Sequence, residues 1–220
     1  MIITLIIFLL SLKSCEQQKF VGHSPAEDQI EKPSQEDLDK LSKAYFASGC
    51  FWCVEAIFES VEGVSEVVSG YSGGSKKDAN YNDVSAGITD HAESVEVYYD
   101  ADVVSYETLL KVFFGSHDPT TLNRQGPDAG RQYRSAIFYQ NEQEKMSAET
   151  YIQKLYSDGV FSEGSITTEL APLDAFYPAE EYHQDFERRN PNQGYVKAVS
   201  IPRLKKFQAK YPELLKKEAH

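Results

Sequence analysis

The chain has 220 residues, of which 41% are hydrophobic, and a formal net charge of −12 at pH 7. This length suits one folded domain with extensions, and the apolar content is sufficient for a hydrophobic core. No run of lysine and arginine forms a basic stripe, so the composition argues against nucleic-acid binding. The sequence also contains no stretch of about 18 apolar residues, so no ordinary transmembrane helix is expected.

The N-terminus begins with an apolar run, Ile2 to Leu12, that leads to Cys15. Its length fits the hydrophobic region of a signal peptide. Residues 12–15, LKSC, resemble the lipobox of bacterial lipoproteins, although Lys13 and the lack of a basic residue before the apolar run depart from that pattern. We therefore expect a lipoprotein-type signal peptide at 1–14 and lipidation of Cys15. The mature protein would then be anchored in the bacterial cell envelope, on the periplasmic side or the cell surface, with an ordinary secretory signal as the alternative.

The next segment, at 15–43, is polar and rich in acidic residues, and it contains Pro25 and Pro33. It has little apolar surface to bury, which predicts a tether with a short helix near residues 35–42. A folded domain is expected at 44–200. A basic amphipathic helix is expected in a C-terminal extension at 201–220, packed on the domain rather than bound to a membrane.

Within the domain, helices and strands alternate along the chain, and two long glycine-containing loops interrupt them. The expected elements are a strand at 44–48, a helix at 51–61, a loop at 69–84, a strand at 95–99, a helix at 105–114 ended by Gly115, a loop at 117–135, a strand at 135–139, a helix capped by Asn141, a strand at 166–170 and a short helix at 179–188. This order predicts an α+β fold in which helices pack on one mixed β-sheet. Loops of this length in a compact domain are usually functional or disordered.

Cys50 and Cys53 lie three residues apart at the start of the expected helix at 51–61, so they share one face of it. Cys50 precedes the first turn, where free backbone N–H groups and the helix dipole stabilise a negative charge. Helix N-termini and the CxxC spacing both lower a thiol pKa from its ordinary value of about 8.5. The pattern therefore indicates Cys50 as a reactive thiolate with Cys53 as a thiol within reach.

Roles other than redox chemistry fit this cysteine pair less well. A zinc site needs about four ligands, and the sequence has no second CxxC and no paired histidines, so no metal site is predicted. A permanent disulfide can form in an exported protein, but closing so short a loop removes little chain entropy. Two buried, inert cysteines stay an open alternative. Redox chemistry is the favoured interpretation.

Glu93 shares the parity of Val95, Val97 and Tyr99, the apolar residues of the expected strand at 95–99. If the strand begins before Glu93, the carboxyl group points to the apolar side, where desolvation raises its pKa and keeps it protonated near neutrality. A general acid requires that property. If the strand begins after Ser94, Glu93 is solvated at its edge, and parity alone does not decide between the two arrangements.

The sequence blocks around these residues resemble peptide methionine sulfoxide reductase A, the MsrA family. GCFWCVE resembles the family's active-site signature, and the further blocks GYSGG, YNDV, HAESVEV, HDPTTLNRQGPDAGRQYRSAI, ITTEL and AEEYHQDF follow in the family's order. The resemblance covers residues 44–194. It implies that the domain at 44–200 is a catalytic reductase domain with a two-layer ferredoxin-like sandwich fold.

The resemblance also implies roles for the residues that carry the chemistry. Cys50 would be the nucleophile that attacks the sulfoxide sulfur and becomes a sulfenic acid. Glu93 would protonate or hydrogen-bond the sulfoxide oxygen and so turn it into a leaving group. His91 and His183 are expected to be structural rather than catalytic.

Five further residues would bind the substrate, as the resemblance implies. Tyr81 and Tyr133 would donate hydrogen bonds to the sulfoxide oxygen, and Asp128 would bind the backbone side of the substrate or hold nearby waters. Phe51 and Trp52 would form the apolar wall against the S-methyl group.

Many members of the family place a resolving thiol in a C-terminal segment after a Gly-Tyr pair. Here no cysteine follows Gly194-Tyr195, so Cys53 is the intramolecular candidate, with Cys15 taken as lipidated. A Cys50–Cys53 disulfide requires the first helical turn to bend or partly unwind. We therefore expect that turn to be mobile.

The expected function is the reduction of methionine S-sulfoxide, free or in proteins, to methionine. No cofactor is expected, because electrons would come from thioredoxin or another dithiol donor, and the protein is expected to be a monomer. Two rival functions remain. A thiol–disulfide oxidoreductase would use the same CxxC without needing Glu93, Tyr81 or Tyr133, and an envelope binding module would use the cysteines only for structure.

Overall fold

The computed structural model of the chain describes residues 32–217. The expected signal peptide at 1–14, Cys15 and much of the expected tether therefore lie outside the described residues. The short helix α1, Gln35–Leu38, lies in the segment where the sequence predicts one, and Lys32 forms an ion pair with Asp185 at 3.1 Å. Between residues 32 and 217, none of the helices has the length and apolar composition that a membrane span requires.

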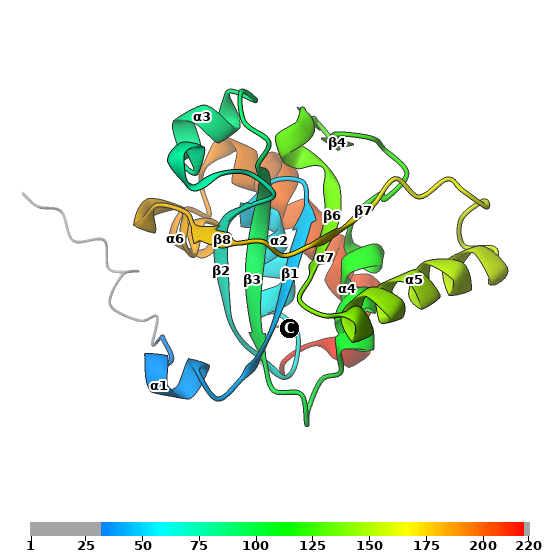
Figure 1. The fold of residues 1–220 in the computed structure, drawn as a ribbon. Coiled ribbons are helices and arrows are strands. Elements are labelled where there is room, and N and C mark those ends of the chain that lie inside the picture. Colours follow the sequence, from blue (N-terminus) through cyan, green and yellow to red (C-terminus); the bar gives the residue numbers. More distant parts are fainter. Residues whose placement is uncertain (1–31, 218–220) are drawn as a thin grey trace, which may run out of the picture. The chain divides into compact units, whose positions relative to one another are not determined.

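Six strands form one mixed sheet in the order β7-β6-β1-β3-β2-β8 (Figure 1). Their bounds are β1 Ser42–Ser48, β2 Val64–Ser72, β3 Ala92–Tyr99, β6 Ser135–Tyr139, β7 Glu169–Pro172 and β8 Phe176–Pro178. β7 runs parallel to β6, and the other neighbours are antiparallel. The short strands β4, Arg124–Gln125, and β5, Asp128–Ala129, pair with each other in a separate hairpin.

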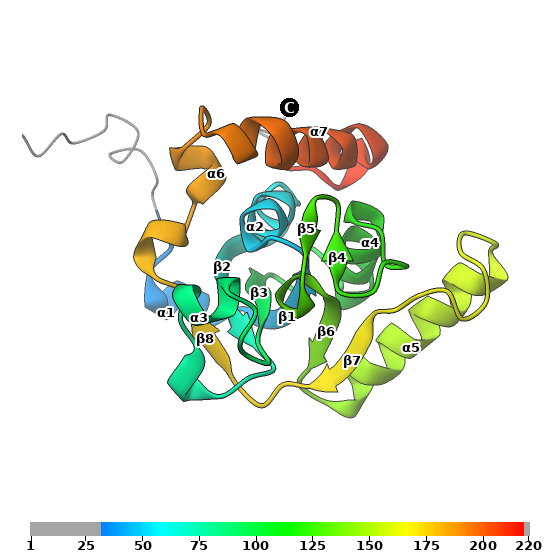
Figure 2. The same cartoon turned by 90° about the horizontal axis from the view of Figure 1, so that it is seen from above.

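Seven α-helices accompany this sheet within residues 32–217. Besides α1 they are α2 Phe51–Glu59, α3 Tyr81–Ser85, α4 Tyr106–Ser116, α5 Glu142–Ser157, α6 Phe186–Arg189 and α7 Ile201–Lys210. A π-helical turn, Val196–Ser200, leads directly into α7. Figure 2 shows α2, α4 and α7 on one side of the sheet, and α7 contacts both α2 and α4.

The elements β1-α2-β2-β3-α4-β6 form the ferredoxin-like unit, because their four strands lie in the order β6-β1-β3-β2. The core lies between this sheet and the two helices, where the ring of Phe46 on β1 stacks on Phe58 of α2 and Phe113 of α4, with centroids 5.1 and 5.2 Å apart. The expected α+β fold, with helices packed on a mixed sheet in a ferredoxin-like sandwich, is confirmed.

Two expected helix starts are observed with their caps. The side chain of Ser105 accepts a hydrogen bond from the Thr108 N–H at the start of α4, and that of Asn141 accepts one from the Glu144 N–H at the start of α5. The expected end of α4 at Gly115 is wrong, since the helix continues to Ser116. A side chain at Gly115 would lie 2.5 Å from the ring of Tyr211, so the glycine admits that ring rather than ending the helix.

The expectation of a loop starting at residue 69 is also wrong. Strand β2 extends to Ser72 and contains Gly70, where a Cβ atom would lie 2.4 Å from the ring of Phe176 on β8. The glycine therefore marks close packing between strands rather than a turn. Residues 73–80 do form the irregular part of the segment, ahead of α3.

Two later elements differ from their predicted bounds. The strand expected at 166–170 is β7, Glu169–Pro172. The helix expected at 179–188 is two short turns, Glu181–His183 and α6, separated at Gln184 and Asp185. The Gln184 carboxamide pairs with the backbone N–H and C=O of Ser69 on β2, and Asp185 has a left-handed φ of 56°, so this contact to the sheet interrupts the helix.

Candidate active site

The two cysteines lie at the N-terminus of α2, where strand β1 delivers the chain through Gly49. Cys50 is the N-cap residue and Cys53 lies in the first turn, with its N–H 3.1 Å from the Cys50 carbonyl. Both are free thiols, with exposed fractions of 7% and 1%. Gly49 has a φ of 94°, and a Cβ atom there would lie 2.7 Å from the side chain of Gln125, so a glycine is required before the cysteine.

The two thiols of the reduced pair have different surroundings. Burial raises the pKa of the Cys50 thiol well above its ordinary value, and the backbone hydrogen bond from Trp52 at the helix N-terminus does not offset this. The hydrogen bond from the Cys50 thiol, together with the charge of Arg203, lowers the pKa of Cys53 to about 6. Desolvation of the Cys50 sulfur thus opposes the helix N-terminus, which is expected to favour a Cys50 thiolate.

Glu93 lies inside strand β3, which begins at Ala92, and its exposed fraction is 2%. Its Oε2 accepts a hydrogen bond of 3.0 Å from the Phe51 N–H, which directly follows Cys50. Burial raises the pKa of this carboxyl group to about 8, although the Phe51 hydrogen bond opposes the shift. The structure thus selects the buried alternative for Glu93, a protonated carboxyl group beside the cysteine.

Tyr81 and Tyr133 approach the same point from two loops. Tyr81 is the first residue of α3, and Tyr133 ends the 3₁₀ turn Arg131–Tyr133. Burial is the main cause that raises both phenol pKa values, and the nearby ionisable groups of Glu93 and Cys50 add to it. Both hydroxyl groups therefore stay protonated and can donate hydrogen bonds next to the cysteine.

The aromatic residues of the cysteine signature pack against His183 and the start of α6. Phe51 is 1% exposed and its ring centroid lies 5.1 Å from that of His183. Trp52 stacks on Phe186 at 3.7 Å, and its Nε1–H donates a 3.2 Å hydrogen bond to Nδ1 of His183. Burial lowers the pKa of His183, so the neutral ring remains an acceptor for the indole.

Asp128, on β5, contacts a residue that the sequence analysis used only as a marker. The Tyr195 hydroxyl donates a 2.5 Å hydrogen bond to Asp128 Oδ2 and lies 3.9 Å from the Cys53 sulfur. In the described residues Asp128 therefore positions Tyr195 over the second cysteine. The Gly-Tyr pair was the signal in the sequence that pointed to this residue.

Two more residues near Cys53 come from the π-helical turn and α7. The Ser200 hydroxyl group helps to lower the pKa of the Cys53 thiol. The Arg203 guanidinium group donates to the Ser116 carbonyl at 2.9 Å and to the Ser48 hydroxyl at 3.2 Å, which holds it at the end of β1. No local pattern in the sequence indicates either residue, because each reaches the site by tertiary packing.

The comparisons with known proteins agree with this site. A family model described as peptide methionine sulfoxide reductase matches residues 42–215. The chain belongs to this family. It is 53% identical over 178 residues to peptide methionine sulfoxide reductase MsrA 2 of Synechocystis sp., across 80% of this chain and 83% of that protein. It is 49% identical to the MsrA of Acinetobacter baumannii, across 80% of this chain and 99% of that protein.

Solved structures show the same fold. Methionine sulfoxide reductase A of Corynebacterium diphtheriae superimposes with a TM-score of 0.61 at 35% identity, covering 69% of this chain and 76% of that chain. Mxr1 from Saccharomyces cerevisiae in reduced form gives a TM-score of 0.64 at 30% identity, covering 75% and 92%. Membership of the MsrA family makes the chain an enzyme of the oxidoreductase class.

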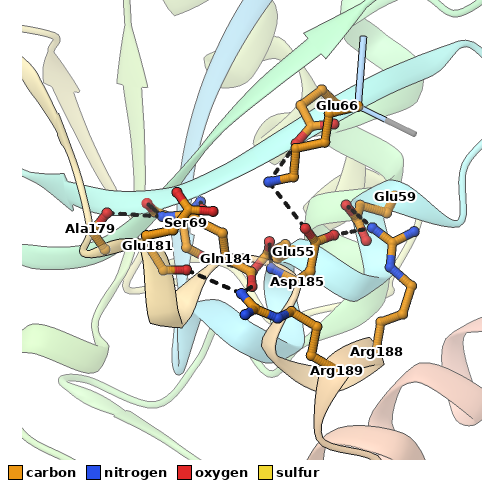
Figure 3. A network of polar contacts seen from close by, with 11 residues as sticks. Glu55, Glu59, Glu66, Ser69, Ala179, Glu181, Gln184, Asp185, Arg188 and Arg189 are labelled. Atoms are coloured by element: carbon orange, nitrogen blue, oxygen red, sulfur yellow. Dashed lines mark hydrogen bonds and ion pairs between the residues drawn. The ribbon is translucent and has the colours of Figure 1, made fainter. Parts of the chain in front are cut away.

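A polar network joins α6 and the residues just before it to α2 and β2 (Figure 3). Glu55 of α2 accepts hydrogen bonds of 2.7 Å from the Ser69 hydroxyl and from the Asp185 N–H. Oxygen atoms of Glu55, Glu59 and Asp185 lie within 4.8 Å of one another, a spacing that a metal ion could bridge. Arg188, 3.5 Å from Glu59, and Lys32, 3.1 Å from Asp185, already supply positive charge to these carboxylates. Within residues 32–217 the network therefore serves as a set of ion pairs that holds α6 against α2.

Proposed function

We propose that this enzyme reduces the S epimer of methionine sulfoxide, free or in proteins, with Cys50 as the nucleophile. The observation that carries the proposal is the buried Glu93 carboxyl group, whose pKa of about 8 keeps it protonated at neutral pH beside the N-terminus of the cysteine helix. A protonated acid next to a sulfur nucleophile is what departure of a sulfoxide oxygen requires.

In the first half of the reaction, the Cys50 sulfur attacks the sulfoxide sulfur. The Cys53 thiolate, hydrogen-bonded to the Cys50 thiol, takes the thiol proton as the attack proceeds. Glu93 gives its proton to the sulfoxide oxygen. This oxygen moves to the Cys50 sulfur as its bond to the substrate sulfur and the new bond between the two sulfur atoms both break. Methionine leaves and Cys50 holds a sulfenic acid.

The residues around this centre have separate binding roles. Tyr81 and Tyr133 donate hydrogen bonds to the sulfoxide oxygen, and Phe51 with Trp52 forms the apolar wall for the S-methyl group. Asp128 acts through Tyr195, which it holds at 2.5 Å, and so defines the side of the site next to Cys53.

In the second half, the Cys53 sulfur attacks the Cys50 sulfur. The new sulfur–sulfur bond forms, the sulfur–oxygen bond of the sulfenic acid breaks, and water leaves. One methionine sulfoxide and two thiols thus give methionine, one disulfide and water. Thioredoxin or another dithiol donor then reduces the Cys50–Cys53 disulfide by thiol–disulfide exchange, and no cofactor takes part.

A single-turnover experiment tests both cysteine roles. The reduced protein is mixed with a methionine-S-sulfoxide peptide without reductant, and methionine and intact protein mass are measured together. We expect one methionine per protein and the loss of two hydrogens in the wild type, whereas Cys53→Ser should release methionine and retain the oxygen. Loss of two hydrogens in Cys53→Ser would refute the resolving role.

Glu93→Gln separates this proposal from a thiol–disulfide oxidoreductase. We expect methionine release to fall by about 10²–10⁴-fold, which is the usual contribution of general acid catalysis. Reduction of the disulfide by a dithiol should be much less affected, because it does not use Glu93. Full methionine release by this variant would reject the assignment of Glu93 as the acid.

We also propose that the protein is a monomeric lipoprotein of the bacterial cell envelope, tethered through Cys15. The support is the apolar run at 2–12 and the lipobox-like sequence that ends at Cys15. Intact mass of protein purified from its native membrane tests the anchor, and a mass without lipid on Cys15 would refute it. Light scattering of the same sample tests the monomer.

A further inference from the structure

The basic helix expected at the C-terminus, α7, borders a cavity beside the active site. This cavity, of about 440 Å³, lies between the end of α4, the β4–β5 hairpin and α7 (Figure 2). Its volume is within the range of about 300–1,000 Å³ that is typical of ligand pockets. Arg203, Lys206 and Lys210 line it from one face of α7. The proposed reaction gives no role to the two lysines.

The cavity adjoins the cysteine turn in two places. Tyr195 lines the cavity, and its hydroxyl group lies 3.9 Å from the Cys53 sulfur. Gln125 and Arg203 line it as well, and a Cβ atom at Gly49 would lie 2.7 and 3.5 Å from their side chains. Because Gly49 directly precedes the proposed nucleophile, residues that flank a bound methionine sulfoxide would extend toward this cavity.

The acidic residues that line the cavity are already paired with other groups. Asp118 accepts hydrogen bonds of 2.9 and 2.6 Å from the N–H and hydroxyl groups of Thr120, and Asp128 accepts one of 2.5 Å from Tyr195. His117 adds no charge, because burial lowers its pKa to about 3 and keeps the ring neutral. The cavity therefore retains the positive charge that α7 supplies.

The two lysines of the cavity are exposed and lack a carboxylate partner. Unlike the ion-paired lysines of residues 32–217, neither Lys206 nor Lys210 forms an ion pair with a described side chain. The Lys210 ammonium group lies 4.9 Å from the centre of the Tyr211 ring, a contact that leaves its charge without a negative partner. In a chain of net charge −12, a cavity lined by free cations is a local site of attraction for anions.

We propose that this cavity binds an acidic side chain that flanks the methionine sulfoxide in a protein substrate, and that Lys206 and Lys210 select it. The inference rests on the proposed function and names its substrate class, which is protein segments with glutamate or aspartate close to the oxidised methionine. A lysine is a flexible point charge with three donors, so the pair can bind carboxylates that approach in different positions. The α-carboxylate of free methionine sulfoxide offers the same chemistry, and the test separates the two sources.

The test compares blocked five-residue peptides with a central methionine S-sulfoxide. A single glutamate, glutamine or lysine is placed at each flanking position in turn, and kcat/KM is measured with dithiothreitol as the donor at low ionic strength. At one or more positions we expect glutamate to exceed glutamine by about 3-fold or more, mainly through a lower KM. Raising the ionic strength from about 0.01 to 1 M should abolish the preference, since the Debye length falls from about 30 to 3 Å.

Charge reversal at the cavity tests the two lysines directly. The double variant Lys206→Glu with Lys210→Glu should prefer the lysine peptides over the glutamate peptides and keep the wild-type kcat on the glutamine peptides. The matched control is Lys197→Glu with Lys205→Glu, which changes the net charge equally at exposed positions of the same segment that do not line the cavity. This control should keep the preference for glutamate. An equal loss in both double variants would show an effect of overall charge and overturn the proposal.

The outcomes separate this site from the proposed function. Equal kcat/KM for the glutamate and glutamine peptides, with methionine released from both, would refute the acidic-residue site and leave the reductase activity intact. The same holds if the lysines affect only free methionine S-sulfoxide and not its N-acetyl amide, because the cavity would then bind the α-carboxylate. Release of no methionine from any peptide would refute the proposed function, and this site with it.

Discussion

The protonation and the position of the Glu93 carboxyl group have two separate causes. Strand β3 places its carboxyl group under the helix N-terminus, and burial keeps it protonated to a pKa of about 8. The Phe51 N–H binds the same carboxyl group at 3.0 Å, so its position is fixed whether or not it carries the proton. The Glu93 carboxyl group is therefore both protonated and correctly positioned before the substrate binds.

The first prediction concerns the pH dependence of methionine release. Because methionine release uses both the protonated Glu93 and the Cys53 thiolate, the single-turnover rate should be highest between about pH 6 and pH 8 and fall as pH rises through about 8. Rapid quench measurements between pH 6 and pH 10 test this in the wild type. A rate that rises steadily across this range would show that deprotonation of a thiol, not protonation of Glu93, limits the step.

The second prediction concerns stability. Folded Glu93 keeps its proton up to about pH 8, whereas the unfolded chain loses it near the ordinary value of 4.5. The native state therefore binds more protons between these values, and its stability falls as pH rises from about 4.5 to 8. Glu93→Gln should remove this loss, which amounts to at most about 5 kcal/mol. Urea unfolding at pH 5 and pH 8.5 measures it, and an equal pH response in the variant would contradict the assignment.

At the scale of elements, the first turn of α2 has to serve two redox states. The reduced turn is closed by hydrogen bonds from the N–H groups of Cys53 and Val54 to the Cys50 carbonyl, at 3.1 and 3.4 Å. A disulfide between Cys50 and Cys53 cannot form on an undistorted helix. The start of the helix therefore has to change while its later turns remain packed on β2 and β3.

The third prediction follows from this turn. Oxidation of the wild type should increase amide hydrogen exchange at residues 53 and 54 while residues 57–59, in the last turn of α2, stay protected. Cys53→Ser exposed to the same oxidant is the matched control, because it cannot form the disulfide. Equal exchange in the reduced and oxidised wild type would show that the disulfide forms without unwinding the helix.

The features that sequence reasoning found lie close together in the chain or follow a local pattern. Cys50 to Cys53 form one motif. The alternation of residues in β3 left two possible positions for the Glu93 side chain, buried on the apolar face of the strand or solvated at its edge. The missed features depend on distant contacts, as with Tyr195, which meets Cys53 across 142 positions. The end of strand β2 was predicted as a loop for a related reason. Gly70 is typical of a loop when only its neighbours in sequence are considered, but a glycine is needed there because the ring of Phe176, on another strand, packs against it.

At the scale of the whole molecule, the C-terminal segment contributes both packing and chemistry. The boundary expected at residue 200 falls between the π-helical turn and α7, yet α7 carries Arg203 to the end of β1 and buries Phe207 in the main core. The family model continues to residue 215. The segment predicted as a C-terminal extension, which contains α7, thus forms one wall of the site.

The fourth prediction tests this dependence. Phe207 is 2% exposed, so Phe207→Ala should lower the free energy of unfolding by about 3–5 kcal/mol, as for other buried aromatic side chains. Lys205→Ala, at an exposed position of the same helix, should change it by less than about 0.5 kcal/mol. Urea denaturation of both variants measures the difference. A loss below about 1 kcal/mol for Phe207→Ala would mean that α7 folds apart from the domain.

The burial of both cysteines, with Cys50 7% and Cys53 1% exposed, also determines the order in which substrate and reductant bind to the enzyme. A disulfide confined to this turn can be reached by a dithiol only after methionine has left, so oxidant and reductant must occupy the same opening in alternation. Steady-state kinetics should then be ping-pong, with parallel double-reciprocal lines and inhibition by excess sulfoxide that more donor relieves. The enzyme would then bind the sulfoxide and the dithiol donor one at a time, never both together.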